Sequence, residues 1–306
     1  MSTPITRIGT TVVSRRHVLG GVAAAGVVAA VAPRLTLAQD AAATPAAPPA
    51  GEAAWPMYNL NTVTTEQILS IPSAGEQMTH EFAEYRPYAT IGQFRAEIGK
   101  YVDEDVVAGY ERYVFVPVDP ADPDADTLRQ LPGVDADEAA RLADGGPYAD
   151  DAAFLAALAG LVSAEQAALA PAFLASVAAA VATWVKYDLN AVSDEQILSI
   201  PGAGEQMTHE FAEYRPYTTI GQFRQEIGKY VDEDVVAGYE RYVFVPVSPN
   251  DADADTLRQL PGVDEDKADA LVAARPFADA SAFLAALGAQ VSPEQAAAAT
   301  AYLAAS

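Results

Sequence analysis

The sequence predicts an all-α protein made of tandem repeats, and three observations support this fold class. The 61 residues from 58 to 118 recur as residues 187 to 247 without a gap and with only 7 differences. Apolar residues in each copy recur at spacings of three and four, which is typical of helices that bury one face. No stretch shows the sustained apolar and polar alternation of a half-buried strand.

The repeat divides the chain into two blocks and four units. The longer repeat has an offset of about 129 residues, and it also places Trp184 on Trp55. A weaker repeat at an offset of about 60 places Leu131-Pro132 on Ile71-Pro72. We therefore predict unit a1 at residues 57–118, unit b1 with a bridging helix at 119–185, unit a2 at 186–247 and unit b2 at 248–306. Units of this size bury little core alone, so neighbouring units are expected to pack in pairs.

The N-terminal 38 residues have the features of an export signal. Arg15 and Arg16 precede an apolar run at residues 18–32, a pattern that resembles the twin-arginine motif. The run is shorter than the roughly 20 residues of a membrane span, and Thr36-Leu37-Ala38 offers a cleavage site. Cleavage would give an extracytoplasmic or secreted protein, and the alternative is an uncleaved anchor. Residues 39–56 are rich in alanine and proline and predict a disordered linker.

Composition narrows the classes of function. The chain has no cysteine, which excludes disulfides and thiolate sites. The formal net charge is −24, and removal of the four leader arginines makes it −28. Such acidity argues against anionic partners, or it reflects a salty habitat, and the sequence leaves both explanations open.

Local patterns place the helix starts and stops. Side chains that can accept a hydrogen bond from the backbone of the third residue on predict helix starts at Thr64, Thr90, Asp103 and Ser163. Met78, Phe82 and Tyr85 lie on one face of a helix predicted over residues 76–85. Residues 114–118 are expected to be an extended connector with room for a short β-pairing, and residues 173–185 a helical bridge.

The turn Ile200-Pro201-Gly202-Ala203-Gly204 lies between two short predicted helices, and Tyr214-Arg215-Pro216 follows the second one. This pattern resembles the helix-hairpin-helix domain of the ComEA family of competence proteins. The resemblance covers about residues 58–306 and is most specific in unit a2. It implies sequence-independent binding of double-stranded DNA. The backbone N–H groups expected to meet phosphate are those of Ser73, Ala74, Gly75, Gly202, Ala203 and Gly204.

Several residues depart from the pattern of a DNA-binding hairpin. Ser73 replaces the first glycine in unit a1, and Asp135 and Asp264 replace the last hairpin glycine in units b1 and b2. A carboxylate there is expected to cap the following helix and close the hairpin to phosphate. Unit a1 carries four basic residues against nine acidic ones, the opposite of the balance in ordinary nucleic-acid binders.

Other candidate chemistry has a simpler structural interpretation. His80 and His209 are interpreted as partly exposed helical residues because no metal-binding cluster accompanies them. The Asp122–Asp126 and Asp251–Asp255 runs have calcium-loop spacing but lack its glycine and its final glutamate, so a loop ending in a helix cap is favoured. The tyrosines of unit a1 are interpreted as half-buried core rather than a binding face; they are Tyr85, Tyr88, Tyr101, Tyr110 and Tyr113.

The sequence leads to two hypotheses of function. No catalytic constellation is present, so we predict a protein that is not an enzyme and that needs no cofactor or metal. The first hypothesis is a scaffold whose acidic units bind protein partners at the cell envelope; some relatives of the ComEA family are similar in fold and serve as protein-binding parts. The second is ComEA-like DNA capture through the a1 and a2 hairpins, where two similar units could act together.

Overall fold

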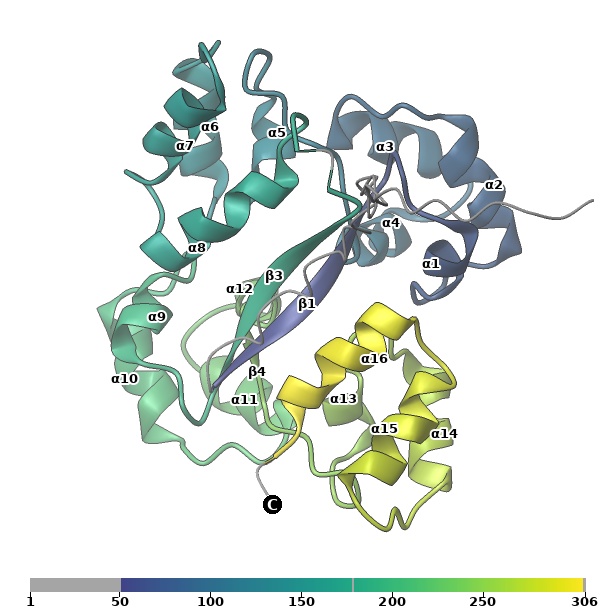
Figure 1. Cartoon of the computed structure of the whole chain (residues 1–306). Coiled ribbons are helices and arrows are strands. Elements are labelled where there is room, and N and C mark those ends of the chain that lie inside the picture. The colour runs from purple at the N-terminus through teal and green to yellow at the C-terminus, as the bar shows by residue number, and fades with distance from the viewer. Residues whose placement is uncertain (1–50, 178, 305–306) are drawn as a thin grey trace, which may run out of the picture. The chain divides into compact units, whose positions relative to one another are not determined.

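The computed structural model describes residues 51–177 and 179–304, which lie within one compact unit (Figure 1). The predicted export signal, with Arg15 and Arg16, lies outside the described residues, as does the linker up to residue 50.

The described part of the chain is a mixed α/β fold, so the prediction of an all-α fold is wrong. Sixteen α-helices surround a four-stranded sheet in residues 51–177 and 179–304. The strands are β1 (Glu52–Asn59), β2 (Val114–Phe115), β3 (Val181–Asp188) and β4 (Val243–Phe244), in the order β2-β1-β3-β4.

Each of the four repeat units contributes four short α-helices. Unit a1 contains α1 (Thr65–Leu69), α2 (Glu76–Glu84), α3 (Ile91–Ile98) and α4 (Glu104–Tyr110). Unit b1 contains α5 (Ala125–Leu128), α6 (Ala136–Asp144), α7 (Asp151–Leu158) and α8 (Ala164–Leu169), and then the 3-10 helix η1 (Ala170–Phe173). Unit a2 contains α9 (Asp194–Leu198), α10 (Glu205–Glu213), α11 (Ile220–Ile227) and α12 (Glu233–Tyr239). Unit b2 contains α13 (Ala254–Leu257), α14 (Glu265–Ala273), α15 (Ala280–Gly288) and α16 (Pro293–Ala299), and then η2 (Thr300–Tyr302).

The two long strands of the sheet are the same segment of the two blocks. β1 and β3 run side by side and antiparallel, and Trp55 lies directly opposite Trp184 (Figure 1). These two residues are equivalent in the 129-residue repeat, so the pairing has a local two-fold axis at the tryptophan pair. Two blocks of one chain therefore meet through a self-complementary interface, as identical subunits do in a symmetric dimer.

The short strands extend the sheet within each block. Tyr58 of β1 pairs in parallel with Val114 of β2, and Tyr187 of β3 pairs in the same way with Val243 of β4. This confirms the short pairing that residues 114–118 suggested.

Two segments expected to lack strands form the centre of the sheet. Residues 52–56 were assigned to the disordered linker but begin β1, and residues 181–185 were assigned to a helical bridge but begin β3. Alternate residues of β3 are buried, but one of these is Lys186, so the strand does not read as apolar alternation. β1 contains Pro56, and proline normally argues against a strand because it has no backbone N–H to donate. β2 pairs only with Tyr58 and Asn59, so on that side of β1 no described strand pairs with Pro56.

The predicted helix starts are largely confirmed. Thr64 and Ser163 form capping boxes with Gln67 and Gln166, and Thr90 accepts the backbone N–H of Gln93. Asp103 is at the N-cap position of α4, but its side chain makes no capping hydrogen bond. Local hydrogen bonding therefore set these boundaries as the sequence indicated.

The second unit of each block packs against the strand of the other block. α16 of unit b2 packs on β1, and the Tyr58 hydroxyl lies 2.7 Å from Ser292 Oγ. In the other half, α8 and η1 of unit b1 pack on β3. Each b unit therefore contacts the a unit of the other block, and neither block is enclosed by its own residues alone.

Aromatic side chains fill the space between the sheet and the helices. Tyr88, Tyr110 and Tyr113 are buried, Tyr85 is half-buried and Tyr101 is exposed. The interpretation of this tyrosine set as core is confirmed for the three buried residues. Phe82 contacts Phe94 edge to face at 5.2 Å between ring centres, and Phe211 and Phe223 repeat this contact in unit a2.

Burial of tyrosines gives a prediction about alkaline pH. Burial raises the pKa of Tyr113, Tyr187 and Tyr242 to about 12, whereas the ordinary value is 10.0. Between these values the unfolded chain releases its tyrosine protons and the folded chain keeps them, so stability falls as the pH rises through this window. We expect the tyrosinate absorbance of native protein to rise later than that of urea-unfolded protein. Complete ionisation near pH 10.0 with the helical signal intact would contradict the burial of these rings.

Candidate functional site

The hairpins of units a1 and a2 lie at the surface. Ser73 and Gly75 are exposed around a buried Ala74, and Gly202 and Gly204 are exposed in the same way around a buried Ala203. A tyrosine of the last helix of the unit stabilises each turn. The Tyr110 hydroxyl donates to the Ser73 carbonyl, and the Tyr239 hydroxyl donates to the Gly202 carbonyl, both at 2.8 Å. The six residues predicted to meet phosphate therefore occur as two separate turns of the same geometry.

The helices that follow these hairpins begin without a side-chain cap. Gly75 and Gly204 are the N-cap residues of α2 and α10, and neither offers a side chain to the free backbone N–H groups. Such a helix start favours an anionic or hydrogen-bond-accepting group from outside. The first residues of the helices, Glu76 and Glu205, are acidic and lower that preference for anions.

The hairpins of units b1 and b2 are closed, as the sequence predicted. Asp135 accepts the backbone N–H groups of Asp137 and Glu138 at 2.7 and 3.0 Å, and Asp264 accepts that of Lys267 at 2.9 Å. Each carboxylate thus occupies the position that a bound phosphate would need.

A glutamine covers each of these closed turns. Gly133 has a φ of +78°, and a β-carbon there would lie 2.2 Å from Gln166 Oε1. Gly262 has the same relation to Gln295, which is fully buried. The capping pattern of Ser163 identified Gln166 in the sequence, but this long-range contact has no local signal.

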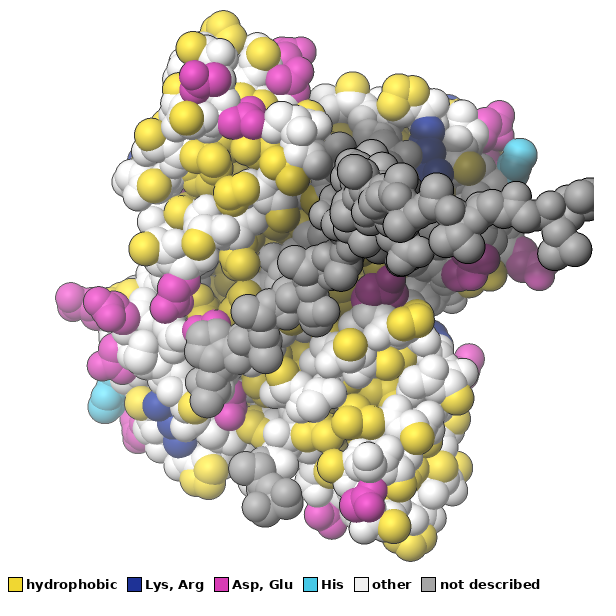
Figure 2. All heavy atoms as spheres, viewed as in Figure 1, with side chains coloured by type: hydrophobic (Ala, Val, Ile, Leu, Met, Phe, Trp, Pro, Cys, Tyr) yellow, Lys and Arg dark blue, Asp and Glu magenta, His cyan; other side chains and the backbone are white. Residues whose placement is uncertain are grey.

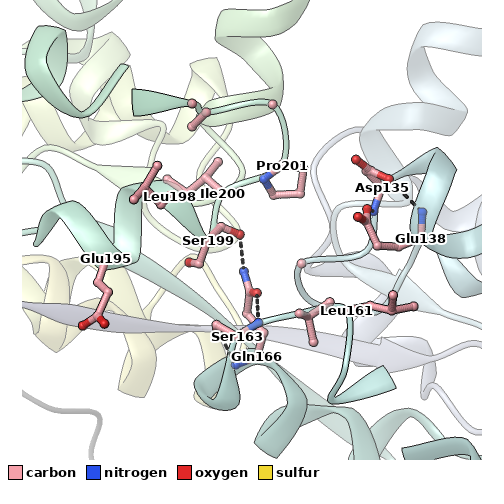
Figure 3. Close-up of a pocket in the computed structure, with 15 residues that line it drawn as sticks. Asp135, Glu138, Leu161, Ser163, Gln166, Glu195, Leu198, Ser199, Ile200 and Pro201 are labelled. Atoms are coloured by element: carbon pink, nitrogen blue, oxygen red, sulfur yellow. Dashed lines mark hydrogen bonds between the residues drawn. The ribbon is translucent and has the colours of Figure 1, made fainter. Parts of the chain in front are cut away.

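A groove separates the b1 hairpin from the a2 hairpin and has a volume of about 620 Å³. We call it the b1/a2 groove; its lining residues are Gly133, Asp135, Glu138, Leu161 to Ser163, Gln166, Glu195 and Leu198 to Gly204. Figure 3 shows Asp135 and Glu138 across the groove from Ile200 and Pro201. Gln166 Nε2 donates to the Ser199 carbonyl at 2.8 Å and ties the two units together beside it.

The charged residues that line the b1/a2 groove are Asp135, Glu138 and Glu195, all of them acidic. A hydrogen bond with Glu138 lowers the pKa of the Asp135 carboxyl. Burial, followed by that same hydrogen bond, raises the pKa of Glu138. Asp135 is therefore the group of this pair that stays ionised to lower pH, next to the a2 hairpin.

Acidic side chains also outnumber basic ones outside the b1/a2 groove, on the face shown in Figure 2. On the face shown in Figure 2, Asp and Glu side chains lie at many places on the described surface, and Lys and Arg side chains appear at few.

Three of the arginines hold the units together internally. Arg86, Arg215 and Arg275 donate to backbone carbonyls that precede the first helix of their units, at 2.6 to 2.9 Å. The arginine of the Tyr-Arg-Pro segment thus serves the fold of its own unit.

The remaining sequence candidates stay apart from the groove. His80 and His209 are exposed, and each lies 3.3 to 3.4 Å from the glutamate four residues on, Glu84 or Glu213. Asp124 and Asp253 cap α5 and α13, which supports the helix-cap interpretation of the aspartate runs. Within the described ranges, no group of three or more histidine, aspartate or glutamate side chains is arranged to hold a metal ion.

No model of a protein family matches this chain, and no curated protein or solved structure matches it either. None of the helices in the described residues combines the length and apolar character needed to cross a membrane.

The two a hairpins differ at one position, which allows a matched test of backbone strain. Ser73 has a φ of 66°, and its equivalent Gly202 has a φ of 79°. This left-handed region costs an L-residue about 1 kcal/mol, and the atoms nearest a β-carbon at Gly202 are at ordinary contact distance. We expect Ser73→Gly to raise the free energy of unfolding in urea by up to about 1 kcal/mol.

The reverse change, Gly202→Ser, is the control and should lower the free energy of unfolding by a similar amount. Changes of the same sign in both variants would show that strain in this turn does not decide the stability.

Proposed function

We propose that this chain is a non-catalytic binding module that holds a segment of a protein partner in the b1/a2 groove. The observation that carries this proposal is the groove of about 620 Å³, whose charged side chains are all acidic. Its size suits a few side chains of an extended or turn-forming segment. The export signal expected in residues 1–38 would deliver such a module to the cell envelope.

Electrostatics favours a basic segment as the ligand. Asp135 and Glu138 lie across the groove from the a2 hairpin, so a lysine or arginine side chain would meet carboxylates there. An incoming phosphate that reached for the N–H of Gly204 would instead approach those carboxylates. The large negative charge of the chain adds a long-range attraction for basic partners and repels nucleic acid.

The other half of the molecule offers a natural comparison. At the position of Glu138, unit b2 has Lys267, whose ammonium group bonds to the Gly262 carbonyl and to Asp264, both at 2.9 Å. Lysine is therefore compatible with the fold at this position. We propose the b1/a2 groove, rather than its counterpart beside Lys267, as the main site for a basic ligand.

A peptide-display experiment tests this function. The full chain, immobilised and panned against random peptides, should enrich peptides that carry lysine or arginine. The Kd of the best peptide should rise by at least about tenfold in Glu138→Lys, because a like charge replaces an attractive one. Fluorescence anisotropy of the labelled peptide measures this change.

The control is Lys267→Gln, which changes the equivalent position in the other half without adding an acidic group, and it should leave the Kd unchanged within about twofold. Enriched peptides without basic residues, or equal binding to wild type and Glu138→Lys, would place the binding elsewhere.

DNA capture is the second candidate, supported by the resemblance to the ComEA family and by the uncapped starts of α2 and α10. Gly75 and Gly204 have backbone angles close to those of Asp135, and a β-carbon at either meets nothing within 4 Å. The double change Gly75→Asp and Gly204→Asp should therefore cap both helices without strain and abolish binding of a labelled DNA duplex.

Anisotropy at low and at physiological salt makes this comparison. Binding by wild type that weakens steeply with salt and disappears in the double variant would establish DNA capture at the hairpins. No binding by wild type at low salt would eliminate it.

A further inference from the structure

A cluster of cations surrounds the tryptophan pair on the local two-fold axis. We call it the axial cluster; its members are Trp55, Trp184, Arg112, Arg241 and Lys186. The Lys186 ammonium lies 4.6 Å from the centre of the Trp55 ring, and the Arg241 guanidinium lies 5.1 Å from that of Trp184. Both indole N–H groups donate to the neighbouring backbone, that of Trp55 to the Arg112 carbonyl and that of Trp184 to the Arg241 carbonyl.

The cluster holds positive charge without a matching carboxylate. Lys186 is only 3% exposed, and its ammonium donates to the backbone carbonyl of Glu240 at 2.8 Å. In residues 51–177 and 179–304, no carboxylate lies within ion-pair distance of Arg112, Arg241 or Lys186. A buried charge of this kind is costly unless a partner of opposite charge joins it.

The nearest glutamates are already committed elsewhere. Glu111 forms a two-point ion pair with Arg95 at 2.7 and 2.8 Å, and Glu240 forms the same pair with Arg224 at 2.6 and 2.9 Å. These geometries use both oxygens of each carboxylate. Neither glutamate therefore pairs directly with the axial cluster, and burial lowers the pKa of Lys186 well below its ordinary value. An anion bound beside Lys186 would favour its charged form.

The axial cluster is accessible from a groove. A cavity of about 10 Å³, room for one water-sized particle, lies among Trp55, Trp184, Arg112, Arg241, Lys186 and Met57. Arg112 and Lys186 also line a larger groove of about 600 Å³, which we call the axial groove. A small molecule in the axial groove could thus place one charged group against Arg112 and Lys186, at the mouth of the small cavity.

The repeat itself singles out Lys186. Its equivalent in the first block is Met57, whereas Arg112 and Arg241 are equivalent to each other. Two equivalent arginines and one additional lysine thus line the same small cavity at the tryptophan pair. Burial of a lysine ammonium costs more desolvation free energy than burial of the methionine at the equivalent position.

We propose that the axial cluster binds the oxyanion of a small molecule, a carboxylate or a phosphate group, where Arg112 and Lys186 face the axial groove. Arg112 supplies a planar donor that matches two oxygens, Lys186 supplies a point charge, and Arg241 adds positive charge behind them, at the small cavity that all three residues line. Acidic residues line the same groove and would repel polyanions such as nucleic acid; they are Asp105, Glu240, Asp255, Asp264, Glu265 and Asp266.

Intrinsic fluorescence tests this site directly, because Trp55 and Trp184 are the only two tryptophans in the chain. The full chain is titrated with sodium phosphate and with sodium acetate, each against sodium chloride at the same ionic strength. We expect a saturable change with one oxyanion or both, beyond the chloride response. The arm that saturates at lower concentration identifies the ligand group as phosphate or carboxylate.

Lys186→Met restores the residue of the other block, and it should weaken oxyanion binding by at least about tenfold. Lys229→Met is the control, because it removes an equal charge from an exposed lysine paired with Glu226, and it should bind as wild type does. The melting temperature gives a second readout, since a ligand that binds only the folded chain raises it. Phosphate or acetate should raise it in wild type and not in Lys186→Met.

Two results would overturn the proposal. One is the absence of any saturable, oxyanion-specific change in both fluorescence and melting temperature of the wild type. The other is unchanged oxyanion affinity in Lys186→Met. If that variant does not fold, Arg112→Gln replaces it, because Arg112 is exposed and its change leaves the sheet intact. Equal affinity in Arg112→Gln would then overturn the proposal.

Discussion

The pairing of one strand with its own copy is the interaction on which the rest of this structure depends. β1 and β3 meet with Trp55 opposite Trp184, and this register places each b unit over the strand of the other block. A change of one residue in register would turn the buried faces of both strands outward. The tryptophan pair and the b units packed on it therefore hold the two blocks in a single arrangement.

That arrangement also creates the two grooves. The b1/a2 groove forms because unit b1 is placed against the hairpin of the other block, and Gln166 fixes the contact through Ser199. The axial groove forms where Arg112 of the first block and Lys186 at the start of the second block come together. Both sites thus lie between blocks, and an isolated block would have neither.

Small differences between the copies give the two halves different chemistry. Glu138 corresponds to Lys267, Gly202 to Ser73, and Lys186 to Met57. Glu138 and Gly202 line the b1/a2 groove, Ser73 lines the axial groove, and Lys186 and Met57 line the small cavity of the axial cluster. The repeated frame keeps the backbone nearly the same, so single side chains decide which half carries an acidic groove and where the axial charge lies. The same frame supplies matched controls, because each altered residue has a natural counterpart in the other block.

Local sequence patterns predicted the repeat, most helix boundaries and the aspartate caps of the b hairpins. The boundaries and caps depend on residues within a few positions of one another, such as Thr64 with Gln67 or Asp135 with Glu138. The sheet, the b1/a2 groove and the axial cluster arise from packing between segments far apart in the chain. β1 contains a proline and β3 contains a buried lysine. Each forms a strand because it pairs with the equivalent segment about 129 residues away in the chain. The energy of such long-range contacts is absent from any local window of sequence, so local patterns alone led to the wrong all-α prediction.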